Sequence, residues 1–160
     1  MAFAVLTAAL VAASPDVGSI AVETSFGQGV QLAPAPFGTA QLTSVMIGGG
    51  YQLRPSLRVD AGLAIGLNAA EEAGLDLEFR PSLVFQPRRL PFYGRVTLGV
   101  VDILSGLTVA VAGGLGVEVL MDDIGLYVEG NMFGRAGESR TGNAKLLWVV
   151  EGRAGGVLRF

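Results

Sequence analysis

From Gly18 to its last residue, the sequence alternates between apolar residues and small or polar ones with a period of two. The clearest run covers residues 57–67, where each odd position is Leu, Val, Ala or Ile and the intervening positions include Arg58, Asp60 and Gly62. Successive side chains of a β-strand point to opposite faces, so this alternation predicts strands with one apolar face. No segment from Gly18 onward has the roughly 18 continuous apolar residues that indicate a transmembrane helix.

Turn-like and loop-like segments divide this pattern into eight runs. They cover residues 20–32, 40–54, 56–68, 75–86, 92–100, 107–119, 126–135 and 145–160. Consecutive strands joined by short connections form an antiparallel up-and-down meander, and closing the meander into a barrel removes both exposed edges. We therefore predict an all-β fold, an eight-stranded antiparallel barrel, over residues 18–160.

The charged residues of the predicted strands all lie on the face opposite the apolar one. Only 16% of the chain is charged, against about 25% in ordinary soluble domains. Seven acids and eight bases share the face, a set that can neutralise itself inside a barrel. We predict a lumenal charge network of Glu23, Arg54, Arg58, Asp60, Asp76, Glu78, Arg80, Arg95, Glu118, Glu129, Arg135, Lys145, Glu151, Arg153 and Arg159.

The remaining positions of this face are mostly Gly, Ala and Ser, which suit a narrow lumen. The opposite face suits lipid, where a charge at mid-depth costs about 2–4 kcal/mol. These features favour a transmembrane barrel with its apolar face outward. The alternative is a soluble lipocalin-like carrier of small ligands with its apolar face inward.

Two residue types that are common in catalytic sites are missing. The chain has no histidine and no cysteine, which excludes Ser-His-Asp triads, thiolate nucleophiles and the usual zinc sites. Asp76 and Glu78 could form an acid/base pair, but Arg80 on the same face favours a structural ion-pair ladder. The acidic pairs at 71–72 and 122–123 are interpreted as solvated turns. We expect no enzyme, no cofactor, and no catalytic, metal or cofactor-binding residue. Nucleic-acid binding is excluded by the net charge of −3.

The first thirteen residues, MAFAVLTAALVAA, form a short apolar run before Ser14 and Pro15. Its length suits a signal peptide and is too short for a membrane span. We therefore expect residues 1–13 to be a signal peptide and residues 14–17 a short lead-in to the barrel. No Lys or Arg precedes the run, which points to a truncated start.

The chain ends in Phe160, preceded by the alternating apolar residues Trp148, Val150, Ala154 and Leu158. With the eight-run pattern, this ending resembles the small bacterial outer-membrane barrels of the OmpA-like and OmpX-like group. The resemblance covers residues 18–160 and implies a Gram-negative outer membrane with both chain termini in the periplasm. It identifies Trp148, Val150, Leu158 and Phe160 as a signal for the barrel-assembly machinery. The implied partners are that machinery, periplasmic chaperones, and outer-membrane lipid with lipopolysaccharide around a monomer.

By the same resemblance, the turns near Pro55, 87–91 and 122–123 are periplasmic, and the connections 33–40, 69–74, 102–106 and 136–143 face outside. Three functional hypotheses follow. The first is a non-enzymatic barrel with a structural, membrane-integrity role and a lumen closed by ion pairs. The second is a narrow pore for water or small solutes. The third is the soluble carrier described above.

Overall fold

The computed structural model describes residues 16–33, 41–68, 75–87, 90–101, 108–138 and 144–160. These ranges contain eight strands, as the alternating pattern predicts. The strands are β1 (Ile20–Ala33), β2 (Gln41–Arg54), β3 (Leu57–Asn68), β4 (Leu75–Phe85), β5 (Phe92–Val101), β6 (Thr108–Met121), β7 (Ile124–Glu138) and β8 (Ala144–Arg159). The predicted signal peptide and Glu71 and Glu72 lie outside the described residues.

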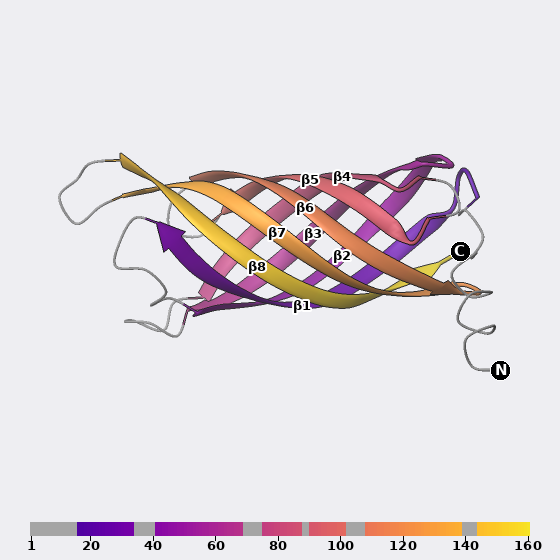
Figure 1. Cartoon of the computed structure of the whole chain (residues 1–160), viewed down its shortest axis with the longest axis horizontal. Coiled ribbons are helices and arrows are strands. Elements are labelled where there is room, and N and C mark those ends of the chain that lie inside the picture. The colour runs from indigo at the N-terminus through magenta and orange to yellow at the C-terminus, as the bar shows by residue number, and fades with distance from the viewer. Residues whose placement is uncertain (1–15, 34–40, 69–74, 88–89, 102–107, 139–143) are drawn as a thin grey trace.

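Each strand pairs antiparallel with the next, and β8 pairs with β1, so the sheet closes into a barrel. The strands tilt around one axis (Figure 1). At one end of the closing seam, the backbones of Ile20 and Phe160 exchange two hydrogen bonds of 3.1 and 2.9 Å. The predicted eight-stranded meander is therefore confirmed.

The end of the barrel that holds Ile20 and Phe160 also carries the tight turns. Two residues join β2 to β3, and Asp122 and Asp123 join β6 to β7. Asp122 has a φ of +53°, a left-handed conformation that Asp tolerates better than most residues. This end is called the terminal end below.

The predicted outer loop over residues 136–143 is too long by three residues. Strand β7 continues to Glu138, where it pairs with Ala144 of β8. Residues 136–138 are Ala, Gly and Glu, which carry no apolar alternation, so the sequence pattern does not mark this part of the strand. The ends of β7 and β8 project furthest at the end opposite the terminal end (Figure 1).

The apolar face of the strands points outward. Large apolar side chains are exposed on every strand, and Leu115, near the middle of β6, is 77% exposed. Soluble monomers rarely expose contiguous apolar patches larger than about 300–600 Å². This belt instead matches the lipid-facing surface of a transmembrane barrel. It also contradicts the soluble-carrier hypothesis, which needs the apolar face inside.

The interior is polar, with two small apolar clusters beside the charges. The first cluster lies near the terminal end and consists of Ala21, Val84, Tyr93, Tyr127 and Val157. Further along the barrel Ala112, Phe133 and Val149 pack together. In the part of the chain that the structure describes, no helix is long and apolar enough to cross a membrane.

Candidate functional site: the charged lumen

Among the side chains that the structure describes, eleven charged ones are buried in the lumen between the strands. Their positions in the alternating pattern place them inside, since the positions between them point outward and are apolar. Six are acids and five are arginines, so the set nearly neutralises itself. Buried charges need partners because desolvation is costly, and the arrangement below supplies them. The residues are Glu23, Arg58, Asp60, Glu78, Arg80, Arg95, Glu118, Glu129, Glu151, Arg153 and Arg159.

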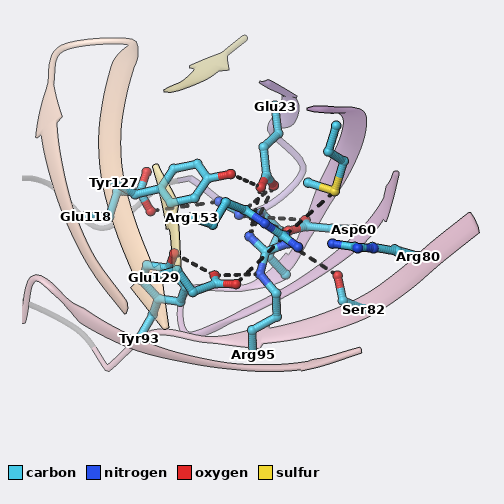
Figure 2. A network of polar contacts seen from close by, with 12 residues as sticks. Glu23, Asp60, Arg80, Ser82, Tyr93, Arg95, Glu118, Tyr127, Glu129 and Arg153 are labelled. Carbon is cyan, nitrogen blue, oxygen red and sulfur yellow. Dashed lines mark hydrogen bonds and ion pairs between the residues drawn. The ribbon is translucent and has the colours of Figure 1, made fainter. Parts of the chain in front are cut away.

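Arg95, on β5, is the centre of a first ion-pair group near the terminal end (Figure 2). Its Nη2 lies 3.1 Å from Glu23 Oε1 on β1, and its Nε lies 2.9 Å from Glu129 Oε2 on β7. Its Nη1 reaches Asp60 Oδ2 on β3 at 3.4 Å. One guanidinium therefore joins carboxylates from three other strands across the lumen.

Arg58 extends this first group along β3. Its Nε and Nη2 donate to the two oxygens of Asp60 at 2.7 and 2.9 Å, the two-pronged geometry that favours Arg over Lys. Longer contacts join Arg58 to Glu23 at 3.7 Å and to Glu118 at 4.0 Å. Glu118 also accepts a hydrogen bond of 2.6 Å from Arg159 Nη2.

A second ion-pair group lies further from the terminal end. Arg80 on β4 contacts Glu78 at 2.6 Å and Glu151 of β8 at 3.2 Å. Glu151 also accepts hydrogen bonds from Arg153 Nη2 at 2.9 Å and from Ser44 Oγ at 2.6 Å. The guanidinium of Arg80 lies 4.9 Å from the ring centroid of Phe133, within the range of a cation–π contact.

The two groups meet at Glu129 and Arg153, whose Oε1 and Nη1 are 3.9 Å apart. With this contact, five arginines and five glutamates alternate in one chain through the lumen. The order is Arg159, Glu118, Arg58, Glu23, Arg95, Glu129, Arg153, Glu151, Arg80 and Glu78. Nearly every charge thus lies between two opposite charges.

Two tyrosines, which are not among the predicted network residues, complete the first group. Tyr93 donates a 2.7 Å hydrogen bond to Glu129 Oε2, and Tyr127 donates to Glu23 Oε1. Their rings meet edge to face, with centroids 6.3 Å apart. Both residues lie on the charged face of their strands, so the alternating pattern already indicates that they point into the lumen.

Inward-facing glycines make room for these large side chains. A Cβ on Gly116 would lie 2.7 Å from Cε1 of Tyr93, and a Cβ on Gly27 would lie 2.6 Å from Oε1 of Glu151. Real Cβ atoms do not approach other atoms so closely. At these two positions the glycine is therefore required by a long side chain that lies across it.

Four residues of the predicted network are not in this assembly. Arg54 is exposed at the end of β2, because the pairing of β2 with β3 shifts between Gln52 and Arg54, and its inclusion in the lumen is wrong. The side chains of Asp76, Arg135 and Lys145 lie outside the described residues.

Two of the other candidate sites include side chains that the structure describes. Glu78 is paired with Arg80, so it belongs to the ion-pair chain. Asp122 and Asp123 are exposed at a hairpin turn. Across the described ranges, no group of three or more His, Cys, Asp or Glu residues could hold a metal ion. The lumen binds its own charges to one another, which neutralises and immobilises them.

The predicted assembly residues all lie on the outward face of β8 or at its end. Trp148, Val150, Leu158 and Phe160 are exposed. Phe160 lies at the terminal end and is 73% exposed. They form one apolar stripe beside the closing seam with β1.

No protein-family model matches the chain, and no curated protein matches it in sequence. Solved structures do match the chain in fold. The crystal structure of Neisserial surface protein A aligns with a TM-score of 0.65 at 16% identity, covering 89% of this chain and 99% of that one. A structure titled as de novo design of transmembrane β-barrels aligns with a TM-score of 0.53 at 14% identity, covering 92% of this chain and 100% of that one. The chain therefore has the fold of the small eight-stranded transmembrane β-barrels, the class that the alternating sequence resembles.

Proposed function

We propose that the protein is a non-enzymatic, integral outer-membrane barrel with a structural, membrane-integrity role and a lumen closed by ion pairs. The observation that carries this proposal is the alternating chain of arginines and glutamates. An ion crossing the lumen has to separate at least one of these pairs. Leaving a buried charge without its partner costs about 3–5 kcal/mol, which makes the chain an effective barrier.

Single-channel recording in planar lipid bilayers tests the closed lumen. We expect no steady conductance from the unaltered protein. A double variant, Glu151→Ala with Arg153→Ala, removes a complete ion pair and serves as the positive control, since it leaves space without an unpaired charge. A steady open conductance of the unaltered protein would contradict the proposal and favour the narrow-pore hypothesis.

The orientation proposed here places the terminal end in the periplasm. The position of both Ile20 and Phe160 at that end supports it, together with the resemblance described above. Because the chain has no cysteine, single cysteines report accessibility directly. We expect Asp122→Cys to react with a membrane-impermeant maleimide only after the outer membrane is permeabilised, and Glu138→Cys to react in intact cells. The reverse pattern would contradict this orientation.

We further propose that the apolar stripe of β8 is read by the barrel-assembly machinery, after delivery by periplasmic chaperones. The exposed ring of Phe160 supports this. We expect Phe160→Ser to lower the amount of folded barrel in cells and to leave refolding into detergent unchanged. Ile20→Ser is the matched control, since Ile20 is an exposed apolar residue at the same end. Equal losses in both variants would show a general folding defect.

The outward apolar belt is proposed to contact outer-membrane lipid and lipopolysaccharide around a monomer. The continuous exposure of apolar side chains on all eight strands supports lipid contact around the whole barrel. Analytical ultracentrifugation in detergent tests the monomer directly, and a stable dimer at low protein-to-detergent ratio would overturn it.

A further inference from the structure

Three buried polar atoms lie where the two ion-pair groups meet and have no hydrogen-bond partner within the described part of the chain. They are Oε1 of Glu129, Nδ2 of Asn131 and Nε of Arg153. None of the three residues is more than 5% exposed. Polar groups buried in this way are rare in folded proteins, because each loses its hydrogen bonds to water without replacement.

The strand register brings the three residues together. Glu129 of β7 lies directly opposite Arg153 of β8, and Asn131 lies opposite Glu151. Side chains that face each other across a strand pair have Cβ atoms about 4.5–5.5 Å apart, and diagonal neighbours about 7–8 Å. All three side chains point into the lumen, so they line one small region of the barrel interior.

The direct contact across this region is too long for a hydrogen bond. Glu129 Oε1 and Arg153 Nη1 are 3.9 Å apart, whereas N–H···O bonds span about 2.7–3.2 Å. On the other side of Asn131, the paired residue of β6 is Gly114, and the amide of Asn131 lies over this glycine, where a Cβ would overlap its Oδ1. The contact that joins the two ion-pair groups is therefore a long one, and polar atoms without hydrogen-bond partners line it.

The chemistry of the junction selects its ligand. Glu129 offers an acceptor, while Asn131 and Arg153 offer donors, so a bridging molecule has to both donate and accept hydrogen bonds. The guanidinium of Arg153 disfavours a cation, and the carboxylate of Glu129 disfavours an anion. Water is neutral, does both, and typically makes two to four hydrogen bonds at buried polar sites.

We propose that ordered water binds at this junction and bridges Glu129 Oε1, Asn131 Nδ2 and Arg153 Nε. The two ion-pair groups are then joined through a hydration site at the contact between them. This inference rests on the closed lumen proposed above, because water in an open pore exchanges with bulk solvent and is not held.

Nuclear magnetic resonance of the whole barrel in detergent micelles tests the site. We expect cross-relaxation between water and the side-chain amide of Asn131, with the sign that marks long-lived bound water. Asn131→Leu identifies the signal by removing it. Met132→Leu, on the outward face of the same strand, is the matched control and leaves the signal unchanged.

The outcomes separate this inference from the proposed function. If the Asn131 amide shows no contact with water while the barrel has no conductance, the hydration site is wrong and the closed lumen stands. If the amide sees water that exchanges as fast as bulk solvent, and the barrel conducts, the closed lumen is wrong as well.

A crystal structure of the unaltered protein gives a second test that needs no variant to fold. We expect ordered density within about 3.2 Å of both Glu129 Oε1 and Asn131 Nδ2, the usual hydrogen-bond range. Direct protein contacts to these atoms in the electron density, with no water between them, would overturn the proposal.

Discussion

The two faces of strand β7 differ completely although they share one backbone. Glu129 and Asn131 are almost fully buried in the lumen, while the flanking Val128 and Met132 are 60% and 49% exposed outside. Inside, each buried charge pairs with an opposite charge, in nearly every case from another strand. Outside, nothing needs a partner because lipid provides a uniform apolar solvent. The contrast shows that the environment of a residue in this barrel depends on the face of the strand on which it lies.

Glycines show the same contrast. Gly116 faces inward and lies against the ring of Tyr93, whereas Gly130 and Gly152 face outward with nothing within 4 Å of a Cβ built on them. The inner glycines are required by crowding, and the outer ones are not. Alanine in place of an inner or an outer glycine should therefore change the stability of the barrel in opposite directions.

The largest effect is expected from removing the centre of the inner network. Arg95→Met leaves the carboxylates of Glu23, Asp60 and Glu129 short of a partner. Truncating one partner of a buried ion pair costs about 3–5 kcal/mol, so we expect a loss of that size in the free energy of unfolding. Urea unfolding of the barrel in lipid vesicles measures it.

The matched substitution on the outer face of the same strand is Leu98→Met. It keeps an apolar side chain of similar volume in lipid, so we expect a change below about 0.5 kcal/mol. If Arg95→Met were as mild as Leu98→Met, the inner face would be solvated and the contrast between the two faces would be wrong.

A charge on the outer face should cost less, and by an amount that depends on depth. Leu115 is near the middle of β6, and Met121 is its last residue. Arg at the bilayer midplane costs about 2–4 kcal/mol, falling to about 0–1 kcal/mol near the interface. We expect Leu115→Arg and Met121→Arg to differ accordingly in the same unfolding assay. Equal and small losses would indicate that water, not lipid, covers this face.

A smaller difference in stability is expected between alanine substitutions of an inner and an outer glycine. Gly116→Ala places a methyl group against Tyr93 and should destabilise the barrel by about 1–3 kcal/mol, as overpacking does. Gly130→Ala meets no atom and should stabilise it by about 0.4–1 kcal/mol, since alanine reduces the freedom of the unfolded chain. Destabilisation by Gly130→Ala would show that the outer glycine is required for a contact with another molecule.

The fold could be predicted because alternation reports directly which face each residue occupies. The ends of the strands are harder to predict from the sequence. At residues 136–138, for example, backbone pairing continues without an apolar pattern. Arg54 was misplaced for a related reason: parity predicts the lumen only while the register is regular, and the register shifts beside it.

The membership of the lumen was largely predictable, but its pairing was not. Arg80 and Glu151 are 71 residues apart in sequence and meet across the barrel. Such pairs depend on how the strands are staggered when the sheet closes, which alternation does not encode. Formal charge alone does not identify Tyr93 and Tyr127 as members of the network, because a buried carboxylate also accepts hydrogen bonds from a hydroxyl group.

The most direct test of the central claim is a spin-label scan along β6 in lipid vesicles. Single cysteines replace Val109, Ala110, Val111 and Ala112, two outward and two inward positions. We predict that labels at 109 and 111 collide with lipid-soluble oxygen, while labels at 110 and 112 are shielded from both oxygen and a water-soluble relaxation agent. Collision of the 109 and 111 labels with the water-soluble agent would contradict a lipid-facing apolar surface around a charged lumen.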